Sequence, residues 1–218
     1  MEADFWRSRW EAGQIGFHRA DPNPLLLRHF PVLGLAPGAR VFLPLCGKTR
    51  DIHWLLAQGF EVAGAELSPL AIGQLFAELG VAPEISNEGA LQRWQGPGIV
   101  IHVGDLFALE AAALGPVDAV YDRAALVALP PELRAAYVLH VVALTGAAPQ
   151  LLVAYEYDQS RRAGPPFSVA ELEIRRLYAP TYRVELLARG ADADGPRSGV
   201  PAQECVWRMA LPGGGADG

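Results

Sequence analysis

The sequence predicts an α/β fold with a mostly parallel central sheet, an antiparallel pair of C-terminal strands and an N-terminal helical lid. Short apolar strands alternate with helical segments of about ten residues, which is the pattern of right-handed βαβ units. Two helical segments precede the first strand, and two strand-like runs close the chain without a helix between them. At 218 residues, the chain suits a single domain, expected over residues 1–211, with a disordered tail at 212–218.

The N-terminal lid is expected over residues 1–37. A helix at 4–12 brings aromatic side chains together at neighbouring positions, and residues 24–33 carry an apolar stripe. The aromatic residues of the first helix are Phe5, Trp6 and Trp10.

The first half of the sheet follows from apolar runs bounded by turn residues. The elements expected there are a strand at 39–45, a helix at 52–58, a strand at 61–67, a helix at 70–79 and a hairpin of strands 91–94 and 99–103. Asp51 is expected to cap the first of these helices. Ser68 is expected to cap the second, where Pro69 suits the first helical position.

The second half continues the alternation and ends in an antiparallel pair. Its expected elements are a strand at 117–123, a helix at 131–144, a strand at 151–157, a helix that ends at Tyr178, and strands at 182–188 and 204–211. Ser168 and Glu171 fit a capping box at the start of the last helix.

Composition and charge exclude several functional classes. The net charge of −6 argues against a nucleic-acid substrate, which requires a basic surface. Apolar runs end well before the ~20 residues of a membrane span, and the N-terminus lacks the basic and apolar regions of a signal peptide, so a cytoplasmic protein is expected. Cys46 and Cys205 lie far apart and the five histidines are scattered, so no metal site is expected.

The residues most informative about chemistry follow the strands, because ligands of open α/β sheets bind beyond the carboxyl ends of the strands. Glu66 ends the second strand, nineteen positions after Gly47. An acidic residue at this spacing accepts hydrogen bonds from ribose hydroxyls in nucleoside-binding folds; the alternative is a solvated carboxylate at a strand end. The preceding loop has one glycine, whereas phosphate-binding loops have several, which favours S-adenosylmethionine (SAM) over NAD or ATP.

Two apolar features have both a structural and a functional interpretation. The N-terminal aromatics either dock a helix on the core or form a lid whose ring faces stabilise the SAM sulfonium. The Gly164-Pro165-Pro166-Phe167 corner is either a turn before a helix or one wall of a flat substrate pocket.

These motifs together resemble the bacterial branch of the thiopurine S-methyltransferase family. The resemblance runs in order from residue 4 to about 180. The segments that carry it are Phe5-Trp6 with Trp10, Gly16-Phe17-His18, Pro44-Leu45-Cys46-Gly47-Lys48, Gly64-Ala65-Glu66-Leu67-Ser68, Asp122-Arg123-Ala124-Ala125-Leu126, Tyr157-Asp158 and Gly164-Pro165-Pro166-Phe167.

The resemblance implies a class I SAM-dependent methyltransferase with a Rossmann-like fold. It implies cofactor contacts from Trp10, Leu45, Glu66 and Arg123, and Arg123 is the predicted catalytic residue. Four further residues complete the predicted cofactor site: Trp6, Gly47, Leu67 and Asp105. The residues expected near the methyl acceptor are Phe17, Pro165, Pro166 and Phe167. The family also implies the acceptor class, thiopurines and, for some members, selenium or tellurium oxyanions.

One segment departs from the family pattern, and three residues need an interpretation of their own. Residues 190–199 are shorter than the charge-rich family segment, with Arg197 a poorly aligned substitute for a family arginine. Cys46 is interpreted as a small buried residue, since no histidine is placed to activate it. Asp122 is interpreted as structural. Lys48 either meets the SAM carboxylate or caps its loop.

The predicted function is therefore transfer of a methyl group from SAM to a small soft nucleophile, by a monomeric enzyme without a nucleic-acid or membrane partner. The acceptor is an aromatic or heterocyclic thiol such as a thiopurine, or a selenium or tellurium oxyanion, which makes detoxification of these metalloids an expected role. The alternative is a non-catalytic protein that binds SAM or a nucleoside. A nicotinamide dehydrogenase is opposed by the missing glycines.

Overall fold

A computed structural model of the chain describes residues 3–14, 19–191 and 200–213. These residues contain nine strands and seven α-helices of an α/β fold. They divide into two compact units, Met1–Val120 and Tyr121–Gly218, and the boundary falls inside a strand, β6. The predicted single-domain organisation stays a prediction. Most of the predicted disordered tail lies outside the described residues.

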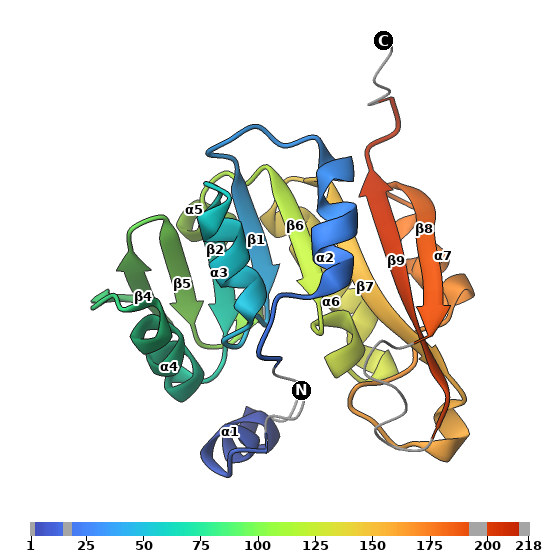
Figure 1. The fold of residues 1–218 in the computed structure, drawn as a ribbon, viewed down its shortest axis with the longest axis horizontal. Coiled ribbons are helices and arrows are strands. Elements are labelled where there is room, and N and C mark those ends of the chain that lie inside the picture. Colours follow the sequence, from blue (N-terminus) through green and yellow to red (C-terminus); the bar gives the residue numbers. More distant parts are fainter. Residues whose placement is uncertain (1–2, 15–18, 192–199, 214–218) are drawn as a thin grey trace. The chain divides into compact units, whose positions relative to one another are not determined.

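The first unit contains parallel strands extended by an antiparallel hairpin. Its elements are α1 (Ala3–Glu11), α2 (Pro24–His29), β1 (Arg40–Pro44), α3 (Arg50–Ala57), β2 (Glu61–Glu66), α4 (Pro69–Leu79), β3 (Glu84–Glu88), β4 (Leu91–Gly96), β5 (Ile99–Val103) and α5 (Ala111–Leu114). β1 pairs with β2, and β2 with β5, in parallel; β4 pairs antiparallel with both β3 and β5 (Figure 1). Parallel pairing brings the carboxyl ends of β1, β2 and β5 to one edge, as the predicted ligand site requires.

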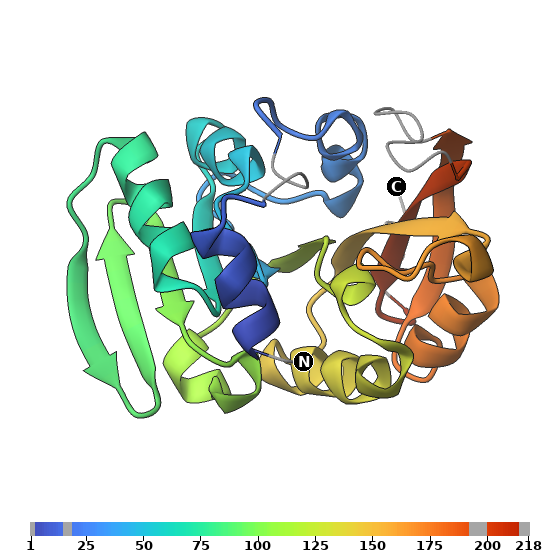
Figure 2. The ribbon, with the colours of Figure 1, turned by 90° about the horizontal axis from the view of Figure 1, so that it is seen from below.

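Helices cover this sheet through apolar side chains. α3 and α4 contact β2, and α1 contacts α4, beside which it lies in Figure 2. The fully buried core includes Phe42, Ile52, Leu75 and Ile101. Burying side chains of this size contributes about 1.5–3 kcal/mol each.

The second unit is an antiparallel sheet with two helices. Its elements are the end of β6 (Ala119–Arg123), α6 (Pro131–Leu144), β7 (Gln150–Tyr157), α7 (Glu171–Tyr178), β8 (Arg183–Ala191) and β9 (Ala202–Ala210). β9 pairs antiparallel with β7 on one side and β8 on the other, so the predicted antiparallel C-terminal pair is confirmed. Trp207, fully buried on β9, lies under the Arg175 guanidinium at 5.4 Å from the ring centroid.

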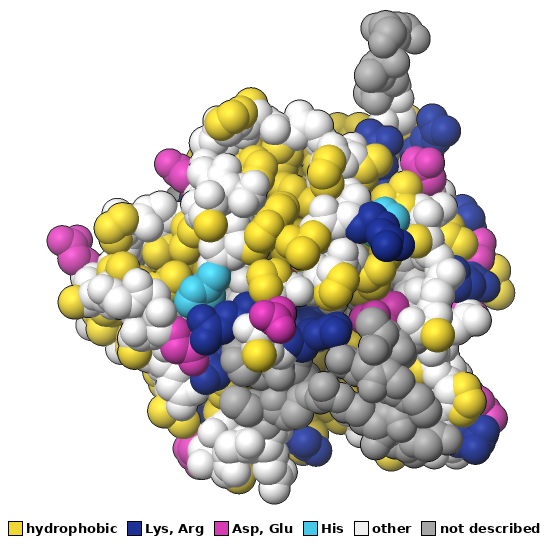
Figure 3. Space-filling model, viewed as in Figure 1, with side chains coloured by type: hydrophobic (Ala, Val, Ile, Leu, Met, Phe, Trp, Pro, Cys, Tyr) yellow, Lys and Arg dark blue, Asp and Glu magenta, His cyan; other side chains and the backbone are white. Residues whose placement is uncertain are grey.

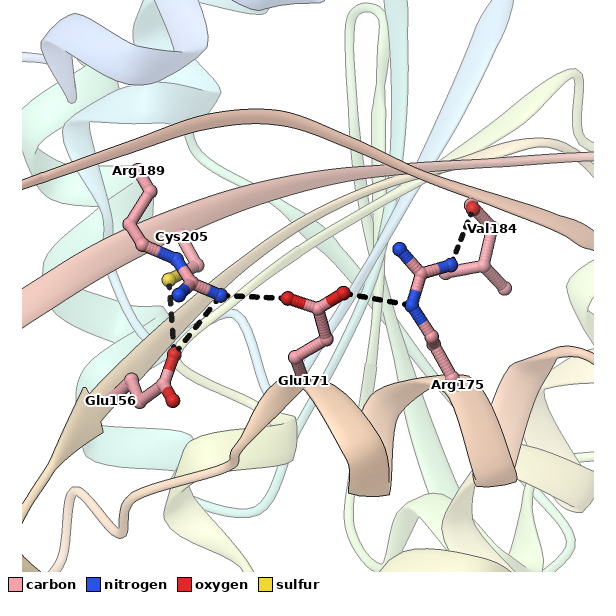
Figure 4. A network of polar contacts seen from close by, with 6 residues as sticks. All are labelled: Glu156, Glu171, Arg175, Val184, Arg189 and Cys205. Carbon is pink, nitrogen blue, oxygen red and sulfur yellow. Dashed lines mark hydrogen bonds and ion pairs between the residues drawn. The ribbon is translucent and has the colours of Figure 1, made fainter.

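A network of charged side chains joins α7 to β7 and β8 (Figure 4). The Arg189 guanidinium contacts Glu171 at 2.8 Å and Glu156 at 3.3 Å. Glu171 also accepts from Arg175 at 2.9 Å, and Arg175 donates to the Val184 carbonyl oxygen. Exposed ion pairs contribute little individually, about 0–1 kcal/mol. The network therefore adds little to stability.

Charged side chains of both signs also lie next to each other on the face shown in Figure 3. None of the described helices is long and apolar enough to cross a membrane.

Two predicted helix caps are wrong. α3 begins two residues earlier than predicted because Thr49, not Asp51, is its cap; the Thr49 hydroxyl oxygen accepts from the Asp51 amide. The buried Asp51 carboxylate instead accepts from the Asn23 amide at 2.7 Å. At α7 the cap is Ala170, without a side-chain bond. The Ser168 hydroxyl oxygen instead accepts from the Tyr157 amide at 3.0 Å.

Two elements, β3 and α5, were not predicted from the sequence. β3 is an edge strand whose residues, apart from Ile85, are polar and mostly exposed, so it lacks the apolar alternation that marks a strand. Its pairing with β4, not its own composition, makes it a strand. α5 is only four residues long, too short for a periodic pattern.

Candidate functional site

The loop after β1 turns back onto the carboxyl end of β2. Leu45 and Gly47 have positive φ values of 48° and 54°. The Cys46 amide donates to the Ala65 carbonyl oxygen at 3.0 Å. Glycine adopts this backbone readily, whereas leucine is strained in it, so interactions with β2 must hold the loop in place.

The Glu66 carboxylate supplies those interactions. One oxygen, Oε2, accepts from the Gly47 amide at 2.9 Å, and Oε1 accepts from the Ser68 amide at 2.8 Å. Glu66 is 6% exposed, so the alternative of a solvated carboxylate is wrong. Burial raises the pKa of this carboxyl, while hydrogen bonds from Ser68, Gly47 and Leu67 act in the opposite direction. Glu66 therefore closes the loop of β1 onto the start of α4.

Trp10 covers the same loop. A Cβ atom on Gly47 would lie 3.1 Å from Cζ2 of the Trp10 ring, and Trp10 is only 4% exposed. The helix α1 is thus docked on the loop through this ring, as in the structural interpretation of the aromatics. Trp6 is half-buried, with its ring edge-on to Phe5 at 5.2 Å between centroids.

The remaining predicted cofactor residues of this unit follow β2 and β5. Leu67 is buried and precedes Ser68, whose hydroxyl oxygen caps α4 by accepting from the Ala71 amide at 3.2 Å. The Gly104 amide donates to the Glu66 carbonyl oxygen at 2.8 Å, so Asp105 follows directly beside the end of β2. Asp105 is exposed and accepts from the Phe107 amide at 3.0 Å. The structure therefore brings the carboxyl ends of β1, β2 and β5 together.

Lys48 and Cys46 receive clear structural roles. The Lys48 ammonium contacts the Glu78 carboxylate on α4 at 2.7 Å, and Arg50 contacts the same carboxylate at 3.4 Å. Lys48 thus anchors the loop to α4; Glu78, its partner thirty positions away, was not found from the sequence. Cys46 is buried, and burial raises the pKa of its thiol well above the usual value, which agrees with a small buried residue and not a nucleophile.

In the second unit, Arg123 ends β6 in a turn. It is half-buried and is followed by Ala124, whose φ is 77°. The neighbouring Asp122 is 1% exposed and accepts three hydrogen bonds from Ala125, Leu126 and Tyr137. This agrees with the interpretation of Asp122 as structural.

The proline corner is held from several directions. The Tyr157 hydroxyl donates to the Pro166 carbonyl oxygen at 2.6 Å, and the Phe167 amide donates to the Val127 carbonyl oxygen at 2.6 Å. Gly164 has a φ of 77°, and a Cβ atom there would lie 2.6 Å from Cδ1 of Phe167. The corner, including Pro165, is therefore shaped around the Phe167 ring.

A buried arginine that the sequence did not single out supports this ring. Arg134, 2% exposed, has its guanidinium carbon 5.8 Å from the Phe167 ring centroid. It donates to the Leu129 carbonyl oxygen at 3.0 Å and pairs with Glu173 at 2.7 Å. Arginine is rarely buried, but the sequence alone does not show that Arg134 is buried, so it carried no signal for this residue.

Two predictions cannot be compared with the structure. Phe17 and Arg197 lie outside the described residues, as does most of the short segment at 190–199. No group of three potential metal ligands occurs among His, Cys, Asp and Glu in the described ranges.

Comparison with known proteins identifies the family of this chain. The model of the thiopurine S-methyltransferase family matches residues 1–208. The chain belongs to this family. It is 57% identical over 210 residues to a thiopurine S-methyltransferase of Xanthobacter autotrophicus, a match that covers 96% of this chain and 99% of the relative. It is 46% identical to one of Gluconobacter oxydans, covering 95% and 94%.

Solved structures agree on the fold. One is a Burkholderia thailandensis 1,6-didemethyltoxoflavin-N1-methyltransferase with bound 1,6-didemethyltoxoflavin and S-adenosylhomocysteine, which matches with a TM-score of 0.65 at 17% identity. The match covers 95% of this chain and 87% of that one. The predicted family and class I methyltransferase fold are confirmed, and with them a SAM-dependent S-methyltransferase.

Proposed function

We propose that this family member transfers the methyl group of SAM to an aromatic or heterocyclic thiol such as a thiopurine, or to a selenium or tellurium oxyanion. Family membership supports the reaction class. The observation in the structure that carries the proposal is the buried Glu66 carboxylate at the end of β2, closed on a loop with one glycine. Detoxification of metalloids and a cytoplasmic location accompany this proposal as expectations.

The residues present fit SAM. A carboxylate has about four lone-pair sites, and the backbone amides of Gly47 and Ser68 use one on each oxygen of Glu66. With the weaker Leu67 contact also counted, at least one lone pair is left to accept from a ribose hydroxyl of a nucleoside. Trp10, Leu45, Leu67 and Asp105 border the same strand ends, and SAM needs no phosphate-binding glycines there.

The chain's own contribution to methyl transfer is alignment and exclusion of water. When bound, SAM would supply a methyl group carried on a sulfonium. The lone pair of an ionised acceptor would attack the methyl carbon in line, so that the bond from the acceptor to carbon forms as the bond from carbon to the sulfonium sulfur breaks. Orientation of the two reactants can supply ~7–11 kcal/mol. No general base is required when the acceptor is already a thiolate.

The second unit is proposed to serve the acceptor. Arg123 either holds the SAM carboxylate or attracts an anionic acceptor, and the family resemblance assigns Phe17, Pro165, Pro166 and Phe167 to the acceptor. These roles separate kinetically. Arg123→Ala raises the dissociation constant of SAM in the first case and the acceptor KM in the second.

The test is a panel of thiols, selenite and tellurite incubated with SAM and the full-length protein, with S-adenosylhomocysteine as the product measured. A heterocyclic thiol is expected to give product at a rate that rises as the thiol ionises. Glu66→Gln is expected to lose most product formation, and Glu61→Gln, at the other end of β2, to retain it. SAM binding without product from any acceptor would contradict the proposal and favour a non-catalytic SAM-binding protein.

A further inference from the structure

A buried carboxylate that the proposed transfer does not use lies next to Arg123. Asp122 sits inside β6, and its Oδ1 accepts from the backbone amides of Ala125 and Leu126, each at 3.2 Å. Its other oxygen, Oδ2, accepts from the Tyr137 hydroxyl on α6 at 2.7 Å. Asp122 precedes Arg123 and the two amides follow it, so these hydrogen bonds span the turn that contains Arg123.

The turn needs such a bridge. Ala124, directly after Arg123, has a φ of 77°, a conformation that residues with a Cβ atom rarely adopt. Strained turns persist only where surrounding interactions hold them. The Asp122 bonds to Ala125 and Leu126 span this turn from both sides of Ala124.

We propose that Asp122, oriented by Tyr137, is the positioning residue for Arg123 and that it acts as an ionised carboxylate. This inference rests on the role proposed above for Arg123. Hydrogen bonds to a charged acceptor are shorter and about twice as strong as those to a neutral one. A neutral carboxyl therefore holds the turn less firmly, and Arg123 is less well oriented.

The groups around Asp122 determine the pH at which its carboxyl group ionises. The titratable groups that face Asp122 are Tyr137 on α6 and Tyr178 on α7, both buried, and burial raises the pKa of each well above its usual value, so both stay neutral. Burial raises the pKa of Asp122 to about 6, against the opposing effect of the Tyr137, Leu126 and Ala125 hydrogen bonds. The carboxylate is thus ionised at neutral pH and loses its charge just below it.

The first test is a pH profile of kcat/KM with SAM and an aromatic thiol bearing electron-withdrawing groups, which is itself ionised throughout the range of about pH 5 to pH 8. The wild type is expected to lose about five-fold in kcat/KM below an inflection near pH 6. Asp122→Asn is expected to show the low value at every pH. Asp118→Asn is a matched control: Asp118 directly precedes β6, and its carboxylate accepts from the Arg40 amide. This variant is expected to follow the wild type.

A second variant, Tyr137→Phe, removes the hydrogen bond from the Tyr137 hydroxyl to Asp122 and leaves the carboxylate in place. Because the Tyr137 hydrogen bond lowers the pKa of Asp122, Tyr137→Phe is expected to move the inflection to higher pH. An inflection that stays in place in Tyr137→Phe, or that persists in Asp122→Asn, would overturn the proposal. Should Asp122→Asn fail to fold, the shift in Tyr137→Phe decides alone.

A double-mutant cycle separates positioning from a general structural role. If Asp122 acts through Arg123, Asp122→Asn has no further effect on kcat/KM in the Arg123→Ala background. Additive losses overturn the positioning role even if Arg123 is important. No loss in Arg123→Ala alone contradicts the proposed function of Arg123 instead, so the two failures are distinguishable.

Discussion

Replacement of Glu66 is the perturbation with the most specific expected outcome. In Glu66→Gln the single amide oxygen can accept from only one of the Gly47 and Ser68 amides, and the new NH₂ group faces the other donor. One buried N–H is then unpaired, which costs about 1–3 kcal/mol of folding free energy. In Glu66→Ala both amides lose their partner, and the cost rises to about 2–6 kcal/mol. Against a typical stability of about 5–15 kcal/mol, Glu66→Gln is the variant that remains folded.

The effect on the cofactor is separate from the effect on folding. If Glu66 accepts from ribose hydroxyls, loss of a charge-assisted bond of about 1.5–3 kcal/mol weakens binding about ten- to a hundred-fold. Isothermal titration with S-adenosylhomocysteine measures this, and urea unfolding of the same sample measures stability. Glu61→Gln changes the same residue type at the exposed start of β2 and should alter neither quantity.

The reasoning is refuted by one combination of results in particular. A destabilised Glu66→Gln with an unchanged dissociation constant would mean that Glu66 only closes the loop of β1 and makes no contact with the ribose.

Three further outcomes are expected. Trp10→Ala removes the ring that covers Gly47, so it should raise the SAM dissociation constant and speed amide exchange across 4–14; equal exchange with and without SAM in the wild type would make α1 a fixed part of the core. Gly164→Ala, with a Cβ 2.6 Å from Phe167 and a φ of 77°, should raise the acceptor KM with little change in SAM affinity, and an unaltered KM would exclude the corner from the acceptor site. Because the pKa of Asp122 is raised from 3.8 to about 6, the folded state binds the proton more tightly than the unfolded state, so this group removes about 3 kcal/mol of stability as pH rises from about 4 to 6. Urea unfolding of Asp122→Asn should lack that loss, and a wild-type minus variant difference that is flat with pH would contradict it.

Local signals were sufficient for the order of most elements and for the proximity of Glu66 to Gly47. The Ser68-Pro69 start of α4 was predictable because a cap and its helix lie within a few residues of each other. Glu66 and Gly47 were recognisable because the strand-loop-strand pattern of an α/β sheet brings those positions to one edge. In each case the interacting groups are set by backbone geometry over a short stretch of chain.

The choice among competing polar partners was decided only by the tertiary structure. Asp51 could have capped α3, but folding brings the Asn23 amide to its carboxylate instead. Lys48 pairs with Glu78, and Arg134 with Glu173, across thirty and thirty-nine positions of the chain. A sequence shows which groups can form hydrogen bonds. A polar group must find a partner only where the folded chain buries it, because burial without a partner is destabilising. Which groups are buried depends on contacts between distant segments of the chain.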